Sequence, residues 1–109
     1  QETFYVSAAL EGIFASLREG KIENTLGLRN RYMKFDVLRG NDYEKAVKQG
    51  FSYWVRKGDF KEANLFRREF GADIDFAEEL TRIVIECKNM GDIELAAKIR
   101  SQYRKEMRF

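Results

Sequence analysis

Acidic side chains are the first candidates for catalytic chemistry in this sequence, because two converging carboxylates can act as general acid and base. Most of them fall in the first turns of predicted helices, where a carboxylate caps free N–H groups and meets the positive end of the helix dipole. We therefore interpret them as helix caps and not as a catalytic pair. The acids concerned are Glu23, Asp59, Glu62, Asp75, Glu78, Glu79, Asp92 and Glu94.

The sequence gives no more support for a nucleophilic or metal site than for an acid–base pair. The 109 residues include no His and one Cys, so mechanisms based on imidazole and most zinc sites are excluded. Cys87 lies on the apolar stripe of a predicted helix without a base to activate it, which indicates a buried structural thiol. The glycines are isolated helix stops and form no phosphate loop. We predict that the protein is not an enzyme and uses no cofactor, metal or small-molecule substrate.

A threefold internal repeat organises the chain. Each copy opens on a glycine (Gly20, Gly58 or Gly91), and the glycines are 38 and 33 residues apart, a spacing typical of helical-hairpin repeats. After each glycine an apolar residue stands at offset two, a small residue at five, a large apolar residue at eight, arginine at nine and an aromatic at twelve. In chain order these columns are Ile22, Phe60 and Ile93; Thr25, Ala63 and Ala96; Leu28, Phe66 and Ile99; Arg29, Arg67 and Arg100; Tyr32, Phe70 and Tyr103.

The repeat predicts pairs of helices. The column offsets fall on one helical stripe, and each glycine suits a helix end, where a positive φ carries no Cβ penalty. The segments 4–18, 43–57 and 76–89 carry apolar residues at helical spacing and are predicted to be the first helices of the pairs. We expect an all-α fold, a right-handed α–α superhelix (solenoid) of three antiparallel helical hairpins with six helices. It would be a single helical-repeat domain over 1–109, or a fragment of a longer solenoid, with repeats at about 1–38, 41–74 and 75–109.

Helix starts carry capping signals. Capping boxes are predicted for Asn41 with Glu44, Asp59 with Glu62 and Asp75 with Glu78, and a single cap for Asp92. Lys21 has no acceptor oxygen, so the first turn is expected to be weaker. The five extra residues of the first repeat are expected to lengthen its second helix or the loop near 33–42. The structural residues of the repeat are predicted to be Gly20, Gly58, Gly91, Ala63, Ala96 and Trp54.

The strings Gly-Asp-Phe-Lys-Glu-Ala (58–63) and Gly-Asp-Ile-Glu-Leu-Ala (91–96) resemble the junction between the two helices of tetratricopeptide and pentatricopeptide repeats. This resemblance covers nearly the whole chain and implies stacked hairpins that bind a protein segment or, in the pentatricopeptide manner, single-stranded RNA at one base per repeat. The chain departs from these families in having no Pro between repeats and an aromatic residue where the tetratricopeptide pattern favours a small one.

A second resemblance covers a shorter stretch. The string from Gly58 to Phe70, followed by another helix and Gly-Asp, is similar in rhythm to the C-terminal helical region of the Vps16 family of endosomal tethering subunits. This resemblance implies vesicle tethering with a partner of the Sec1 type. Residues 71–75 replace the Pro-Asp-Lys-Arg stretch expected there.

Two groups of residues are candidates for binding. Tyr53 and Ile85 lie off the apolar stripe of their first helices, which line the concave surface of such stacks, so they could anchor a partner. Gln49, Arg56, Arg82 and Glu86 would surround them with polar groups. The arginines at the ends of the second helices could bind RNA phosphates or an acidic peptide, or could be cations that favour helix C-termini. They are Arg29, Arg67, Arg68 and Arg100.

The function that we predict is non-catalytic: a helical-repeat protein–protein interaction module that acts as a scaffold in a larger assembly. Binding of single-stranded RNA and membership of an endosomal vesicle-tethering complex are the alternatives. The 20 basic and 18 acidic residues give a net charge of +2, which argues against tight binding through the RNA backbone. Apolar runs are too short for membrane insertion. We expect an intracellular, cytoplasmic protein, with mitochondrial or endosome-associated locations as alternatives.

Overall fold

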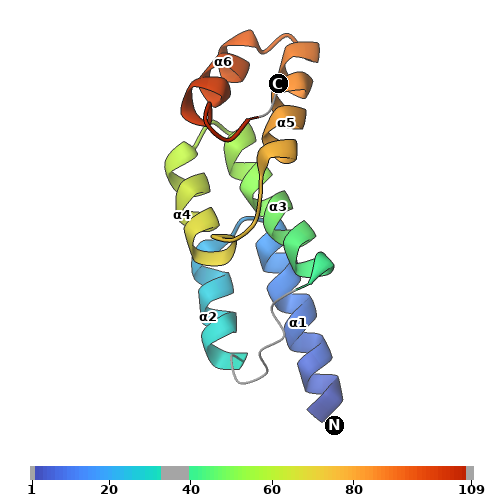
Figure 1. The fold of residues 1–109 in the computed structure, drawn as a ribbon. Helices are drawn as coiled ribbons and strands as arrows, with labels where there is room; N and C mark the ends of the chain where they lie inside the picture. Colours follow the sequence, from blue (N-terminus) through green and yellow to red (C-terminus); the bar gives the residue numbers. More distant parts are fainter. Residues whose placement is uncertain (1, 33–39, 108–109) are drawn as a thin grey trace.

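The computed structural model describes the backbone of residues 2–32 and 40–107 and the side chains of 10–31 and 40–107. Over these ranges the regular structure consists of six α-helices and no strand, which confirms the predicted all-α class (Figure 1). The predicted first helices agree with α1, α3 and α5 to within two residues at each end. The helices are α1 (Glu2–Arg18), α2 (Ile22–Tyr32), α3 (Asn41–Arg56), α4 (Phe60–Phe70), α5 (Ala77–Asn89) and α6 (Ile93–Gln102).

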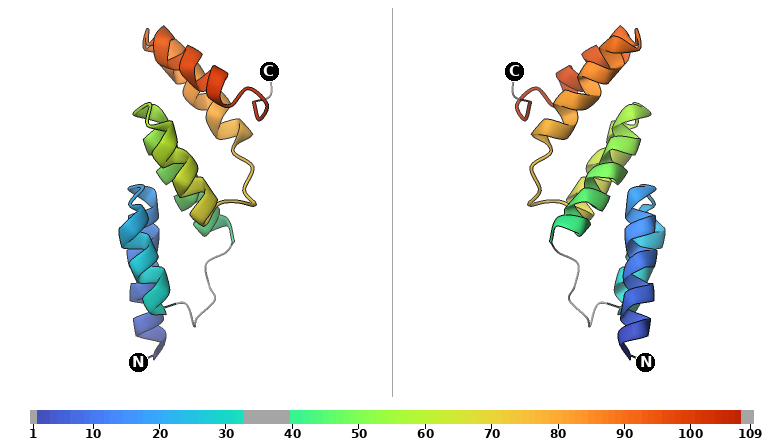
Figure 2. Two further views of the ribbon diagram at one scale, coloured as in Figure 1. Left: turned by 90° about the vertical axis from the view of Figure 1, so that its left-hand side faces the viewer. Right: turned by 90° about the vertical axis from the view of Figure 1, so that its right-hand side faces the viewer.

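The helices pair in chain order and the pairs are stacked. The helix α1 packs on α2, α3 on α4 and α5 on α6, while α3 also packs against both α1 and α5. Figure 1 shows α1, α3 and α5 in one layer and α2, α4 and α6 in the other, and the stack measures 51 × 21 × 21 Å. In Figure 2 the corners between paired helices lie along one edge, and each hairpin is tilted further than the one before it.

The three corners have the same backbone geometry. At the second corner the Gly58 N–H donates to the Val55 carbonyl (2.9 Å) and the Asp59 N–H to the Trp54 carbonyl (3.1 Å), the two bonds of a Schellman motif. The equivalent pairs of bonds form at the first and third corners. The corner glycines Gly20, Gly58 and Gly91 have φ values of 71°, 76° and 84°. The three glycines therefore mark equivalent corners, as the repeat predicts.

Two of the predicted caps are confirmed. The Asp59 carboxylate accepts from the Glu62 N–H (3.2 Å) and the Asp92 carboxylate from the Leu95 N–H (3.1 Å). The second hydrogen bond of the predicted capping box, from the Asp59 N–H to the Glu62 side chain, does not form. The Asp59 N–H donates to the Trp54 carbonyl instead, as part of the corner. The second and third corners thus each end one helix and cap the next within three residues.

The other two predicted caps differ from expectation. The box of Asn41 with Glu44 is wrong, because Asn41 is the first residue of α3 and Gly40, with φ of 95°, precedes it. Asp75 lies one residue before the N-cap Phe76, and its carboxylate accepts from the Ala77 N–H (2.9 Å). The predicted site of the five extra residues lies mostly in 33–39, outside the described residues.

Small side chains let the two helices of each hairpin approach. Thr25, Ala63 and Ala96, the small column of the repeat, are all buried. In the first hairpin the Thr25 hydroxyl donates to the Lys21 carbonyl (2.6 Å) and lies 2.6 Å from the Ser16 hydroxyl, which is also buried. The polar atoms at this position are therefore hydrogen-bonded, as a buried hydroxyl requires.

An aromatic cluster joins the second and third hairpins. The rings of Phe51 and Phe76 have centroids 4.4 Å apart, and Tyr103 meets Phe51 edge-on at 5.7 Å. The Tyr103 hydroxyl donates to the Asn64 side-chain oxygen (2.9 Å). Burial raises the pKa of Tyr103 to about 12, so the hydroxyl stays protonated and keeps donating even in alkaline solution where a free tyrosine ionises.

A different contact joins the first and second hairpins. The predicted structural residue Trp54 is half-buried, and its Nε1–H donates to the Gly20 carbonyl (2.7 Å). Gly50 is buried beside it, where a Cβ would overlap the Leu17 carbonyl oxygen and lie 2.8 Å from Cε1 of Phe66. The helices α1 and α3 therefore approach backbone to backbone at this joint.

The second corner supplies a test of the repeat. Gly58→Val is expected to lower the free energy of unfolding by ~1–2 kcal/mol, because a residue with a Cβ is strained at positive φ. The nearest atom to a built Cβ, Leu95 Cδ1 at 3.6 Å, is an ordinary contact, so the loss reports strain and not overlap. Urea unfolding measures it, with Gly27→Val in α2 as the control, since no neighbour lies within 4 Å of a Cβ there. An unchanged unfolding midpoint for Gly58→Val would contradict the assigned corner.

Candidate functional site

A groove of about 560 Å³ crosses the layer of first helices, and we call it the central groove. It contains four of the six predicted partner-binding residues and brings α1, α3 and α5 together at one surface. The predicted set is therefore largely gathered in space, although its members come from two repeats. The groove is lined by Arg18 of α1, by Gln49, Ser52, Tyr53, Arg56 and Lys57 on and just after α3, and by Glu79 and Arg82 of α5.

Tyr53 is the exposed ring of the central groove. It is 39% exposed and meets the Trp54 ring edge-on, with centroids 5.1 Å apart. The Lys57 ammonium lies 4.6 Å from the centre of the Tyr53 ring, within the range of a cation–π contact. These two contacts fix the ring while leaving part of it open to a partner, which suits an anchor residue.

The central groove is cationic. Arg18, Arg56, Lys57 and Arg82 line it against one carboxylate, Glu79, whereas the whole chain has a net charge of only +2. Arg82 pairs with Glu79, and Arg56 pairs with Glu86 at 2.7 Å across α3 and α5. Because exposed ion pairs contribute only ~0–1 kcal/mol, an acidic ligand can compete for these cations.

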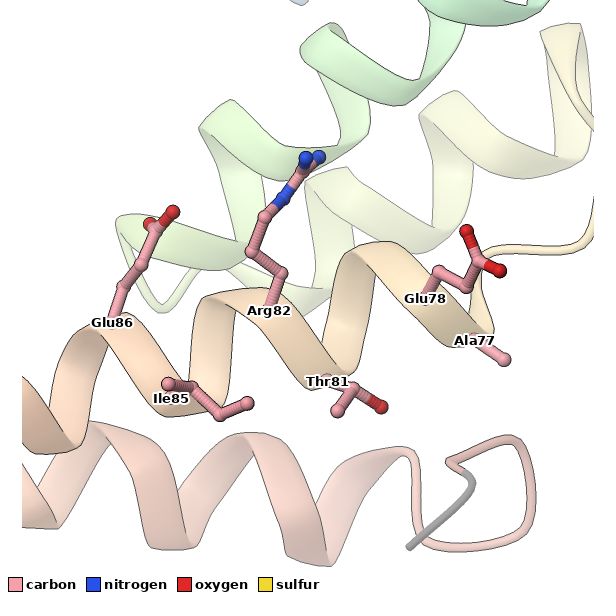
Figure 3. A pocket seen from close by; sticks show the side chains of 6 residues that line it. All are labelled: Ala77, Glu78, Thr81, Arg82, Ile85 and Glu86. Atoms are coloured by element: carbon pink, nitrogen blue, oxygen red, sulfur yellow. The ribbon is translucent and has the colours of Figure 1, made fainter.

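The remaining predicted partner-binding residues lie in a second depression on α5. This depression, about 330 Å³, is lined by Ala77, Glu78, Thr81, Arg82, Ile85 and Glu86. Figure 3 shows Arg82 reaching from α5 toward the second hairpin, while Ile85 and Thr81 lie on another side of the helix. Ile85 is 51% exposed and does not line the central groove. Tyr53 and Ile85 therefore belong to two separate surfaces.

Besides the buried Ser52, three residues of the central groove lie outside the predicted partner-binding set: Arg18, Lys57 and Glu79. A signal for Arg18 was present in the repeat, since Arg18 and Arg56 both stand two residues before a corner glycine. Lys57 and Glu79 carry no comparable signal, because their place in the groove depends on how α5 crosses α3.

The arginine column links successive hairpins. Arg29 of α2 donates to the Glu69 carbonyl (3.2 Å), lies 3.6 Å from the Glu69 carboxylate and stacks 5.4 Å from the Phe70 ring centre. Arg67 of α4 pairs with Glu106 just after α6. Its guanidinium also lies 5.6–5.9 Å from the ring centres of Phe51, Phe76 and Tyr103. These two candidate RNA contacts are thus engaged within the chain. Arg68 and Arg100 are exposed.

Cys87 is free and buried, as predicted. Burial raises the pKa of its thiol, and the nearby Asp92 carboxylate raises it further, so the unreactive thiol form is favoured. In the described part of the chain, His, Cys, Asp and Glu form no cluster of three or more that could hold a metal ion. None of the described helices is long and apolar enough to cross a lipid bilayer.

No protein-family model, curated protein or solved structure matches this chain. The geometry alone describes it: stacked helical hairpins with a cationic groove across their first helices.

Proposed function

We propose that the chain is a non-catalytic helical-repeat module that binds a partner protein in the central groove. The observation that carries this proposal is Tyr53, a partly exposed ring held in place among cations from three helices. The proposed partner segment is extended and acidic, with an apolar side chain that packs on Tyr53. Carboxylates of the segment would bind Arg18, Arg56 and Arg82.

The proposed mechanism is preorganisation. Most of the lining residues sit on helices that already pack against one another, so ordering the groove costs little at the moment of binding. Because exposed aromatic and arginine side chains are the commonest hot spots of protein interfaces, Tyr53 and its arginines are expected to dominate the affinity.

We further propose that the stack is a right-handed solenoid. Three corners with equivalent backbone hydrogen bonds, and contacts between successive first helices, support this architecture. The progressive tilt of the hairpins in Figure 2 supports it too, because a constant rotation per repeat generates a superhelix. A solenoid presents equivalent positions of successive first helices on one surface, which is the arrangement that the central groove needs.

Single-stranded RNA is the competing ligand. Arg29 and Arg67, which the RNA interpretation needs, already bind Glu69 and Glu106 of this chain. Exposed Arg68 and Arg100 on α4 and α6 are the residues that would have to carry RNA binding. The geometry of the arginine column therefore favours the protein partner.

Affinity capture with the full chain from its native source, followed by identification and titration of the captured protein, tests the proposal. Tyr53→Ala should weaken binding by about tenfold or more, the size expected for a hot-spot ring. Tyr53→Phe, the matched control, should retain binding because the ring stays. Capture should also survive ribonuclease treatment.

Two outcomes would change the assignment. Binding that is lost after ribonuclease treatment, or in Arg68→Ala/Arg100→Ala while Tyr53→Ala binds normally, would assign RNA instead. A captured partner of the Sec1 type that depends on Tyr53 would identify the interaction module as part of a vesicle-tethering complex.

A further inference from the structure

The joints between hairpins use equivalent positions of the repeat. Counted back from the corner glycine, the positions nine, six, five and two residues before it form one face of each first helix. On α1 these are Glu11, Phe14, Ala15 and Arg18, which line a depression of about 540 Å³ against α3. On α3 they are Gln49, Ser52, Tyr53 and Arg56, which line the central groove against α5. In the first two repeats, this face of the first helix therefore lies against the first helix of the following hairpin.

On α5 the same face has no following first helix against it in the described part of the chain, although Arg82 and Glu86 reach back to α3, where Glu86 pairs with Arg56. Arg82, Ile85 and Glu86 hold the positions nine, six and five before Gly91, and the depression that they line is made of α5 residues alone. At position six, Phe14 is half-buried against the core under α3, and Ser52 is 4% exposed under α5. Ile85 at that position is 51% exposed. Figure 3 shows this residue on the side of α5 away from the second hairpin.

The third corner, at Gly91, likewise lacks the contacts from a following hairpin that the first two corners have. A Cβ built at Gly20 would lie 2.6 Å from Trp54 Nε1, and one built at Gly58 would lie 3.6 Å from Leu95 Cδ1, so the next hairpin covers both corners. At Gly91 no described atom lies within 4 Å. Beside it Met90 is 84% exposed.

The offset-two column completes the pattern. Ile22 and Phe60 pack against the core, and Tyr103 of the third hairpin meets Phe60 edge-on with ring centres 5.9 Å apart. Ile93, the third member of the column, is 61% exposed. Ile85 and Ile93 therefore expose apolar side chains at positions of the repeat that are half-buried or buried in the first two copies. Together with Met90 beside Gly91 we call them the terminal face.

We propose that the terminal face is the docking surface of a further antiparallel helical hairpin, supplied by a partner. Its first helix would pack on α5 as α3 packs on α1, with small side chains opposite Ile85 in the manner of Ala46 and Gly50 of α3. The occupant is helical because the surface continues an interface that two helical hairpins already form in this structure. The terminal face is a different surface from the central groove, because none of its three residues lines the groove; the depression around Ile85 shares only Arg82 with it.

The test adds such a hairpin to the full chain. A second copy of residues 40–71, the hairpin that covers Phe14, is joined after Phe109 by a flexible linker. Docking should give one unfolding transition with a midpoint raised by about 4–8 °C, the shift that ~1 kcal/mol produces in a domain of this size. Ile85→Glu, or separately Ile93→Lys, should remove the rise. In the unextended chain both substitutions should leave the midpoint within about 2 °C, because the side chains are exposed.

Three results would overturn the proposal. The first is an extended chain that unfolds at the parent midpoint, and the second is a rise that persists in Ile85→Glu. The third is concentration-dependent sedimentation of the unextended chain that Ile85→Glu abolishes, which would assign the terminal face to a second copy. Tyr53→Ala in the extended chain should keep the rise, so failure here is distinguishable from failure of the central groove.

Discussion

Gly50→Ala is expected to destabilise the protein by about 3 kcal/mol, at the upper end of the range for overpacking a close-packed site. In an ordinary helix the same substitution stabilises by ~0.5–1 kcal/mol, because alanine loses less backbone entropy on folding. The sign is reversed here because a Cβ at Gly50 would overlap the Leu17 carbonyl oxygen and the Phe66 ring. The Phe66 ring can turn, but the Leu17 oxygen belongs to the backbone of α1 and moves only if α1 and α3 separate.

The matched control is Gly27→Ala in α2. A Cβ at Gly27 has no neighbour within 4 Å, so only the helix propensity acts and the free energy of unfolding should rise slightly. Urea unfolding of both variants compares the same chemical change in two environments. Equal effects of the two substitutions would show that α1 and α3 do not meet at Gly50.

Ala63→Glu should have the largest effect on stability, a loss of ~3–5 kcal/mol, the cost of an uncompensated buried charge. Ala63 is 0% exposed and lies in the small column of the repeat, where α4 packs on α3. A loss of this size is a large part of the ~5–15 kcal/mol that holds a typical domain together. The thermal unfolding midpoint should therefore fall by more than about 10 °C, which circular dichroism would measure.

Ala97→Glu is the control for this substitution. Ala97 is exposed on α6, so the same change should alter stability by no more than ~0.5 kcal/mol. Acidification should recover part of the loss in Ala63→Glu, because a protonated carboxyl costs less to bury than a carboxylate. If Ala63→Glu melted like the parent protein, the repeat register would be misplaced.

The sequence by itself determined the corners and the helices between them. A Schellman motif is a local structure: a glycine at positive φ and two backbone hydrogen bonds within six residues suffice. The caps of Asp59 and Asp92 are equally local, since each carboxylate reaches an N–H three residues away. Three copies of one pattern therefore predicted the positions of six helices to within a few residues.

Predictions from local sequence patterns were wrong or incomplete where two interpretations of the same residues were possible. Asn41 had the right spacing to Glu44 for a capping box, but Gly40 could adopt a positive φ and α3 begins one residue earlier than that box requires. Side-chain type likewise could not tell whether Arg29 and Arg67 face a ligand or the next hairpin, because their partners Glu69 and Glu106 are about 40 residues away.

Only the tertiary structure decided which surfaces exist. It placed Arg18, Tyr53 and Arg82 in one groove and moved Ile85 to a separate face of α5. It also gave Gly50 its role, which depends on the carbonyl of Leu17 in another hairpin. The repeat register orders residues along each helix, but the distance and crossing between helices come from side chains that meet across hairpins. Those contacts join residues far apart in the chain, so no short stretch of sequence contains them.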